Sequence, residues 1–350
     1  MSKSVQQKSV TITDVAKEAG VSPSTVSIIL NGKGSQYRIS GETQERVLAL
    51  AADMNYRTNA FAKNLVMRSA DESPIVGIFW ENFYEQGPLK EFCAGLMLYN
   101  SECSRNFELA IYPYTAGNLS AMRRVIDLGL CQGAIVTGFA DKDREFLLSL
   151  NKSLPLVLFN RDLEDISAVY SDNYAIGQQA AECLLRWNPE SLVCINPTTS
   201  NKNPGIRFAG FYDTCIRSGV PGDAISVFYD ANTDEGGFAA AEQILSACKP
   251  PLGVFISGDC MLSGCIKSLK AHGLQIPGDA WAVCFGNNLV CEVMTPSITS
   301  IFLPSRRMGY DCLKMIDLSL SGVISSGNIK THKCLLTYRE SCPERAGSKE

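Results

Sequence analysis

The sequence predicts an α/β protein in which an N-terminal all-α head precedes two lobes, each built on a doubly wound parallel sheet. Two observations support this prediction. Helical spacing and capping signals fill residues 11–57, and from Pro74 onward short apolar runs alternate with helix-like segments. Alternating β and α segments are typical of a parallel sheet with helices on both faces. The length of 350 residues also exceeds one ordinary domain.

Two helices joined by a glycine turn open the head. Apolar side chains at Val15 and Ala19 recur at helical spacing, and Gly20 is expected to end this helix because glycine takes positive φ at low cost. Ser22 is a suitable N-cap, and Pro23 occupies the first position of a second helix.

The second helix has an apolar inner face and a small, mostly polar outer face. The side chains expected to be buried are Val26, Ile29 and Leu30. The side chains expected to face outward are Ser24, Thr25, Ser27 and Ile28. This pattern predicts a helix-turn-helix, and an ordinary surface hairpin of helices is the alternative.

Two further helical segments complete the N-terminal region. Ser40 can cap a third helix, whose core stripe is expected to comprise Val47, Leu48, Ala51 and Met54. Residues 59–68 form a brief amphipathic segment, shorter than the roughly 12 residues at which an isolated helix becomes stable in water. We expect this segment to fold only against a partner such as DNA, and an ordinary linker is the alternative.

Apolar runs locate eight buried strands and predict two blocks of four or five. The first block comprises residues 75–80, 107–112, 133–137 and 155–159, and the second comprises residues 191–195, 224–229, 252–256 and 281–285. Ligands bind such sheets at the carboxyl ends of their strands. The cleft between the two lobes is therefore the expected binding site.

The charge distribution separates the head from the remainder. Residues 1–70 contain nine Lys and Arg against five Asp and Glu, a net charge of +4, whereas residues 71–350 contain 23 against 31, a net charge of −8. A basic module on an acidic body suits polyanion binding by the head alone. No signal peptide is visible, and no apolar run approaches the roughly 20 residues that span a bilayer. We therefore expect a cytoplasmic protein that does not contact membranes.

Cysteine and histidine usage predicts neither a metal site nor a cofactor. The 14 cysteines begin at Cys93 and include no CxxC pair, and the two histidines are His272 and His332. The spacing of a Cys/His zinc site is therefore absent. Glycine-rich nucleotide loops and the G-x-S-x-G motif are also absent. We expect buried, reduced cysteines, and redox sensing stays open.

The motifs together resemble the lactose/galactose-repressor (LacI) family over nearly the whole chain. The most specific motif is TITDVAKEAGVSPSTVS at residues 11–27, followed by residues 30–34, 42–47 and 55–65. The similarity resumes at residues 157–161, 171–177, 207–211, 258–264, 273–277, 296–299 and 338–341.

The resemblance implies a homodimeric transcriptional repressor. Family members bind a pseudo-palindromic operator in double-stranded DNA, and their two-lobed domain is similar to periplasmic sugar-binding proteins. A small-molecule effector, expected here to be a sugar or sugar derivative, binds between the lobes. No heptad stretch follows Ser341, so a dimer is expected and a tetramer is left open. A solute-binding transport protein and a sugar-processing enzyme on the same fold are the alternatives.

The resemblance also implies a division of the chain. Residues 1–57 form the DNA-binding head, and residues 58–73 form the hinge helix and linker. Residues 74–341 form the two-lobed domain, with lobe 1 at about 74–170 and 303–330, lobe 2 at about 171–302, and a terminal strand at 331–341. Residues 342–350 are expected to be a flexible tail.

By the same resemblance, the second helix enters the major groove. The expected base-reading residues are Ser22, Pro23, Ser24 and Ile28, and the expected phosphate contacts are Thr25, Ser27 and Asn31. Further expected DNA contacts are Thr13, Asn59, Ala62 and Leu65, of which Leu65 would wedge into the minor groove. Ile28 departs from the family, which often has an Arg or another polar residue there. An Ile can contact a thymine methyl but cannot hydrogen-bond a guanine edge.

The effector site is expected around Arg207, which matches the arginine that hydrogen-bonds the small molecule. The other expected residues are Glu81, Asn82, Phe83, Tyr84, Asn160, Asn201, Asn203, Asn232, Gly258, Asp259 and Gly286. Gly258 and Gly286 replace an Asn and an Asp that usually hold ligand hydroxyls. A standard hexose is therefore less strongly expected, and a bulkier ligand is the alternative.

Overall fold

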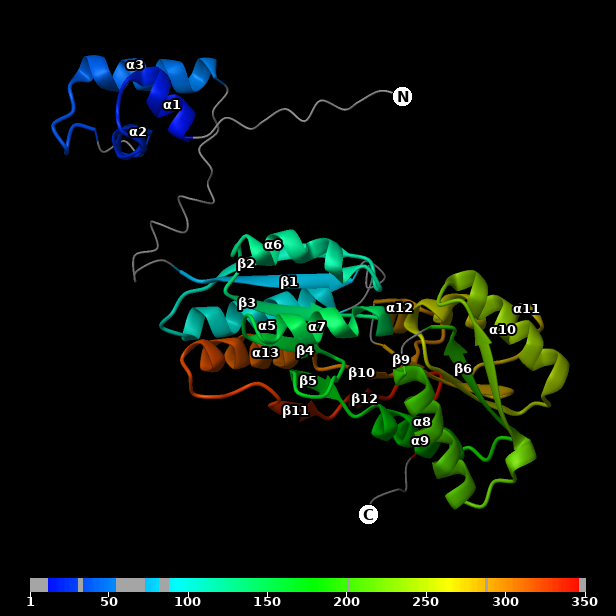
Figure 1. The fold of residues 1–350 in the computed structure, drawn as a ribbon. Coiled ribbons are helices and arrows are strands. Elements are labelled where there is room, and N and C mark those ends of the chain that lie inside the picture. Colours follow the sequence, from blue (N-terminus) through cyan, green and yellow to red (C-terminus); the bar gives the residue numbers. More distant parts are fainter. Residues whose placement is uncertain are drawn as a thin grey trace. The chain divides into compact units, whose positions relative to one another are not determined.

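The computed structural model describes residues 12–30, 34–54, 73–81, 88–199, 202–286 and 289–345. The chain divides into two compact units, residues 1–72 and residues 73–350 (Figure 1). Within the described ranges, no helix is both long and apolar enough to cross a bilayer. The predicted fold class, an all-α head followed by two α/β lobes, is confirmed.

The head consists of three helices, α1 (Ile12–Ala19), α2 (Pro23–Leu30) and α3 (Gly41–Asp53). Gly20 has a φ of +67°, as its place after α1 requires. The Ser22 hydroxyl accepts a hydrogen bond from the Thr25 amide at 3.1 Å and so caps α2. Val26 and Val47 are fully buried where the helices meet.

The prediction that Leu48 belongs to the core face of α3 is wrong. The side chain of Leu48 is 49% exposed, whereas Leu50 and Met54 pack against the core. Consecutive residues of a helix are about 100° apart, so a stripe centred on Val47 continues at positions three, four and seven residues later. Leu48 therefore lies on the outer face.

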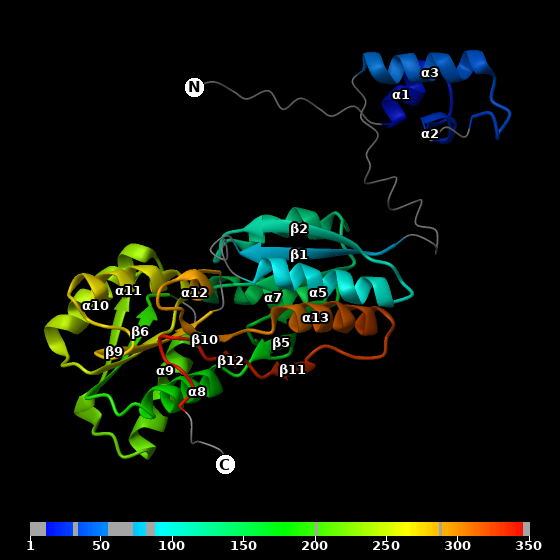
Figure 2. The same ribbon diagram turned by 180° about the vertical axis from the view of Figure 1, so that it is seen from behind.

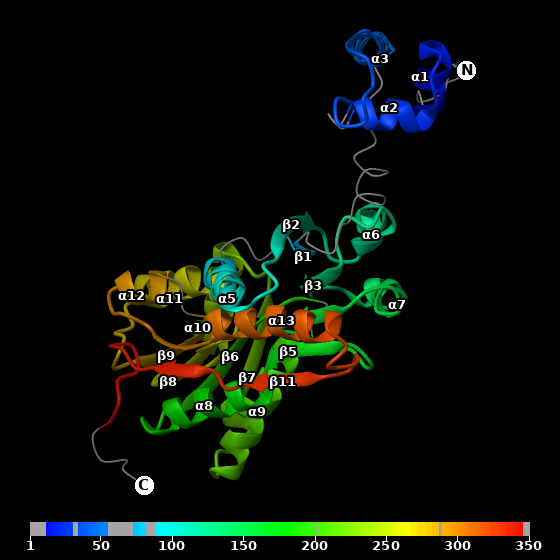
Figure 3. The ribbon, with the colours of Figure 1, turned by 90° about the vertical axis from the view of Figure 1, so that its left-hand side faces the viewer.

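The first lobe contains a six-stranded sheet in which every neighbouring pair is parallel. Its strands, in spatial order, are β11 (Ile329–His332), β5 (Ser167–Ser171), β4 (Leu156–Phe159), β3 (Gly133–Thr137), β1 (Ile75–Glu81) and β2 (Glu108–Tyr114). Helices α5 (Leu89–Glu102) and α13 (Ser305–Leu320) cover one face, and α6 (Arg123–Asp127) and α7 (Arg144–Leu150) cover the other (Figure 3).

The second lobe repeats this plan with one antiparallel edge strand. Its order is β12 (Leu335–Thr337), β10 (Thr299–Phe302), β9 (Ala280–Phe285), β8 (Leu252–Ile256), β6 (Ser191–Pro197) and β7 (Ile225–Asp230), and β12 is antiparallel to β10. Helices α8 (Asn173–Leu185) and α9 (Asn203–Arg217) pack on one face, and α10 (Asp234–Ala247) and α11 (Leu262–Ala271) on the other. The short helix α12 (Leu289–Val293) follows β9.

The chain makes three passages between the lobes. They follow β5, β10 and β11. The expected terminal strand at 331–341 is instead two short strands, with β11 in the first sheet and β12 in the second. Strands β5 and β10 were not among the eight predicted. Ser and Thr interrupt the apolar run of each, at Ser167 and Ser171 in β5 and at Thr299 and Ser300 in β10, so neither stands out as a continuous apolar run.

The expected flexible tail also begins too early. Cys342 is fully buried, and its Sγ lies 3.5 Å from that of Cys183 on α8. Its carbonyl oxygen accepts a hydrogen bond from the Thr299 hydroxyl at 2.7 Å. Cys342 therefore belongs to the core of the second lobe and not to a tail.

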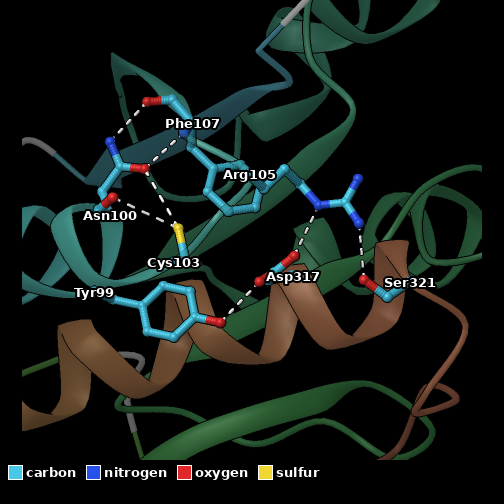
Figure 4. A network of polar contacts seen from close by, with 7 residues as sticks. All are labelled: Tyr99, Asn100, Cys103, Arg105, Phe107, Asp317 and Ser321. Carbon is cyan, nitrogen blue, oxygen red and sulfur yellow. Dashed lines mark hydrogen bonds and ion pairs between the residues drawn. The ribbon is translucent and has the colours of Figure 1, made fainter. Parts of the chain in front are cut away.

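A polar network joins α5, α13 and the start of β2 (Figure 4). Asp317 accepts hydrogen bonds from the Tyr99 hydroxyl and from Nε of Arg105, both at 2.8 Å. The side-chain amide of Asn100 on α5 pairs with both backbone groups of Phe107, at 2.6 and 2.9 Å. Helices α5 and α13 run side by side in Figure 2, so the network holds the beginning of β2 against this helix pair.

Candidate functional site

The outer face of the head presents the described residues that were predicted to contact DNA. Thr13, Ser22, Pro23 and Ser24 are exposed, and Thr25, Ser27 and Ile28 are half-buried along α2. The Ser22 and Thr25 hydroxyls lie 2.8 Å apart, so the helix cap also orders this small polar surface. Asn31, Asn59, Ala62 and Leu65 fall outside the described residues, as does the expected hinge helix.

The second unit contains a cavity of about 1370 Å³ at the carboxyl ends of strands from both sheets. All eight described residues that were expected at the effector site line it. They are Glu81, Asn160, Asn203, Arg207, Asn232, Gly258, Asp259 and Gly286. Asn82, Phe83, Tyr84 and Asn201 fall outside the described residues. Strand-end loops that are distant in sequence therefore converge on one cavity, as doubly wound sheets predict.

Arg207 is held rigidly in the wall of this cavity. It is 5% exposed, and its Nε and Nη2 donate hydrogen bonds to the hydroxyl and the carbonyl of Ser257 at 3.0 and 2.9 Å. Its Nη1 donates to Oδ1 of Asn173 at 3.0 Å, and the guanidinium lies 4.0 Å from the centre of the Phe285 ring. A buried cation needs such partners because burial removes its hydration.

The partners of Arg207 were not predicted. Asn173 lies inside the motif at residues 171–177, and Ser257 directly precedes the motif at 258–264. Those motifs were the available signal, but a sequence does not say which loops meet. The structure adds Ser257, Asn173 and Phe285 to the cavity region as the residues that orient the guanidinium.

Close contact between α8 and α9 sets the position of Arg207. A Cβ on Gly177 of α8 would stand 1.9 Å from the carbonyl oxygen of Arg207, and a Cβ on Gly210 would stand 2.1 Å from that of Tyr174. Only glycine permits this approach. The two helices therefore pack backbone to backbone beside the cavity.

The two glycines that replace polar family residues lie beneath polar side chains from neighbouring loops. A Cβ on Gly258 would stand 2.6 Å from Oδ1 of Asn232. A Cβ on Gly286 would stand 2.5 Å from the Cβ of Asp259, and the φ of Gly286 is +120°. The cavity therefore has an amide over Gly258 and a carboxyl over Gly286.

The carboxyl of Asp259 has a shifted pKa. Burial raises the pKa of Asp259, while hydrogen bonds from Cys260 and the nearby charge of Arg207 lower it.

The backbone of Asn160 is in the left-handed region. It has a φ of +54°, a conformation that Asn adopts more readily than most residues. Its carbonyl accepts a hydrogen bond from the side chain of Asn203 at 3.1 Å, which joins the two lobes.

Two family models match the chain. The model of bacterial regulatory proteins of the lacI family matches residues 11–59, and the model of a periplasmic binding protein-like domain matches residues 190–342. The chain belongs to the LacI family. This LacI-family protein is therefore a helix-turn-helix transcriptional regulator, as its sequence predicts.

Relatives agree with this assignment. The LacI-family chain is 28% identical over 305 residues to the probable HTH-type transcriptional repressor ExuR of Bacillus subtilis (strain 168), and this match covers 85% of this chain and 88% of ExuR. It is 25% identical over 345 residues to the HTH-type transcriptional repressor PurR of Erwinia tasmaniensis, and this match covers 94% of this chain and 96% of PurR. These relatives are transcriptional regulators rather than enzymes.

Solved structures share the fold. A complex of the transcriptional regulator CelR with cellobiose matches with a TM-score of 0.67 at 23% identity, over 95% of this chain and 99% of CelR. A lac repressor dimer bound to operator and the anti-inducer ONPF matches with a TM-score of 0.69 at 18% identity, over 96% of this chain and 100% of that chain.

Proposed function

We propose that this LacI-family protein is a homodimeric repressor whose affinity for a pseudo-palindromic operator is set by a small molecule bound between its lobes. The observation that supports this most is the joint presence of a helix-turn-helix with an exposed polar face and a separate unit with a large cavity whose lining includes several charged and amide side chains. The effector is a sugar or sugar derivative, and no cofactor is required. The protein acts in the cytoplasm, where a bacterial operator lies.

The head reads each half-site with α2. Ser22, Pro23, Ser24 and Ile28 face base edges in the major groove, and Thr25, Ser27 and Asn31 contact phosphates, with Thr13 beside them. Across the dimer axis, the hinge segments insert side by side in the minor groove. In this arrangement Asn59 and Ala62 approach the backbone and Leu65 wedges between base pairs.

The effector binds where strand ends of both lobes converge. Arg207 and Asn203 contribute donors from the second lobe, and Asn160 and Glu81 contribute acceptors from the first. The remaining contacts come from Asn82, Phe83, Tyr84, Asn201, Asn232, Gly258, Asp259 and Gly286. A ligand held from both sides favours a closed arrangement of the lobes, because its contacts are complete only there.

A binding experiment with full-length protein tests this proposal. Selection from randomised duplexes yields the operator, and a thermal-shift screen of sugars, nucleosides and sugar phosphates yields a bound ligand. We expect the ligand to change operator affinity, and linkage requires the operator to change ligand affinity by the same factor. Unchanged operator affinity at saturating ligand contradicts the proposal. Rapid turnover of the bound sugar would favour an enzyme instead.

A further inference from the structure

Arg161 occupies an unusual place at the junction of two cavities. It directly follows Asn160 at the end of β4 and lines both the large cavity and a neighbouring one of about 320 Å³. Its guanidinium carbon lies 5.0 Å from the centre of the buried Phe139 ring. Stacking on an aromatic face fixes the plane of a guanidinium and leaves its N–H groups directed outward around the edge.

The guanidinium of Arg161 has no polar partner among the residues that the structure describes. Its Nε is buried and makes no hydrogen bond to a described residue. The guanidinium instead lies over the ring of Phe139. Arg207, in the same cavity, is by contrast bonded to Ser257 and Asn173. A buried, unpaired donor on a cation is costly, so its presence in a binding cavity indicates a ligand that satisfies it.

The acids that border the smaller cavity are already engaged. Asp162, the next residue in the chain, forms an ion pair with Lys202 at 3.0 Å. Asp172 caps α8 and accepts a hydrogen bond from the amide of Ala175 at 3.0 Å. Neither carboxylate is therefore committed to neutralising Arg161.

The large cavity has an excess of positive charge. Its charged lining residues are Lys90, Arg161, Arg207, Arg306 and Arg307 against Glu81, Glu91 and Asp259. Glu91 and Arg306 pair at 3.0 Å and neutralise each other, Arg307 pairs with Asp311 at 3.6 Å, and burial raises the pKa of Asp259. Lys90, Arg161 and Arg207 then stand against Glu81 and Asp259. This excess is notable because residues 71–350 as a whole have a net charge of −8. A positively lined cavity in an acidic body favours anionic ligands.

Asn160 supplies a second unpaired group beside the guanidinium. The residue is 6% exposed, and its Oδ1 is buried without a hydrogen-bond partner among the described residues. Its backbone amide donates to the carbonyl of Val169 at 2.8 Å, which holds the residue at its positive φ. An amide oxygen accepts hydrogen bonds. A ligand hydroxyl therefore suits Asn160, whereas an anionic oxygen suits Arg161.

We propose that Arg161 recognises an anionic group on the effector, so that the ligand is an acidic sugar with a carboxylate or phosphate at Arg161 and a hydroxyl at Asn160. This inference rests on the proposed function, because it takes the large cavity to be the effector site. It assigns Arg161 as a specificity-determining residue that the sequence did not single out. Charge-assisted bonds to a planar guanidinium are the strong contacts of such a site.

Calorimetric titration of the full-length protein with matched sugars tests the ligand class. The carboxylate arm consists of D-glucuronate, D-galacturonate and D-gluconate, the phosphate arm of glucose 6-phosphate, and the neutral arm of glucose and galactose. We expect at least one anionic sugar to bind at least about tenfold more tightly than its neutral parent, which corresponds to about 1.4 kcal/mol or more. The arm that binds identifies the anionic group. Equal binding of a neutral parent, or binding of no member of either anionic arm, overturns the proposal.

Three variants separate recognition from structural support. Arg161→Gln removes the charge, and Arg161→Lys retains it. Arg123→Gln is the control, since Arg123 on α6 lies 5.5 Å from the ring of Phe146 on α7 and lines neither cavity. We expect Arg161→Gln to weaken the anionic sugar at least tenfold and leave the neutral parent unchanged, with partial rescue in Arg161→Lys and no change in the control. Equal weakening of charged and neutral sugars indicates a structural role and contradicts the proposal.

Operator binding distinguishes failure of this inference from failure of the proposed function. If a neutral sugar binds best and still alters operator affinity, the regulator proposal stands and the acidic-ligand inference fails. If the acidic sugar binds through Arg161 but operator affinity does not respond to it, the ligand class stands and the proposed regulation fails.

Discussion

The side-chain oxygen of Asn232 lies over Gly258, 2.6 Å from the point where a Cβ on Gly258 would stand. Asp259 has a similar relation to Gly286. Each glycine leaves room for a polar side chain from another loop. The cavity thus has polar groups near both positions, although glycine itself supplies none.

A Cβ at position 258 is expected to displace Asn232. Gly258→Ala should destabilise the protein because the new methyl group also meets Pro197 at 3.3 Å and Met261 at 3.4 Å. Adding Asn232→Ala should recover part of this loss, with a coupling of about 0.5–3 kcal/mol in a double-mutant cycle measured by urea unfolding. Strictly additive effects would show that the two residues do not compete for this space.

The contact between α8 and α9 should tolerate no side chain at Gly177. Gly177→Ala places a Cβ 1.9 Å from a backbone oxygen of Arg207, and since backbone cannot rotate away, we expect a loss of about 1–3 kcal/mol. Gly205→Ala is the matched control on α9, where a Cβ meets nothing within 4 Å. The control should be neutral or stabilising by up to about 1 kcal/mol. Similar midpoints for both variants in urea would contradict this account.

Burial of Asp259 should make stability depend on pH. An acid whose folded pKa is raised contributes stability that is present below its unfolded pKa of about 3.9 and is lost as pH rises through the folded pKa. Asp259→Asn cannot ionise and escapes this loss. The Tm of Asp259→Asn minus that of the unsubstituted protein should therefore increase between pH 4 and pH 7.

The exposed Asp223 provides the control for this pH dependence. Asp223→Asn should not reproduce the trend. A Tm difference for Asp259→Asn that is constant or falls with rising pH would show that the folded protein does not disfavour the ionised form of Asp259.

The half-buried Ile28 on α2 should influence half-site choice. Ile28→Arg replaces an apolar contact, suited to a thymine methyl, with a donor pair suited to guanine, so the selected half-sites should gain a G·C pair at one position. One well-placed bidentate contact is worth about 1–3 kcal/mol of discrimination. Selection from randomised duplexes with both proteins measures this shift. An unchanged profile would remove Ile28 from the base-reading face.

Much of the fold follows from local patterns. Gly20, Ser22 and Pro23 mark the turn between α1 and α2 because cap and turn preferences depend on adjacent residues alone. Long apolar runs identified eight strands, since buried parallel strands are apolar on both faces. Strands β5 and β10, at the passages between lobes, escaped prediction because Ser and Thr interrupt their apolar runs.

The sequence by itself determined the helical head, the two α/β lobes and the family, because each is written in residues close together in the chain. Only the tertiary structure decided which loops meet. Ser257 bonds to Arg207 across 50 residues and Asn232 lies over Gly258, while Nε of Arg161, at the junction of two cavities, has no hydrogen-bond partner among the described residues. These relations depend on how the carboxyl ends of separate strands converge. No local pattern encodes that convergence, so the cavity's polar partners appear only once the sheets are assembled.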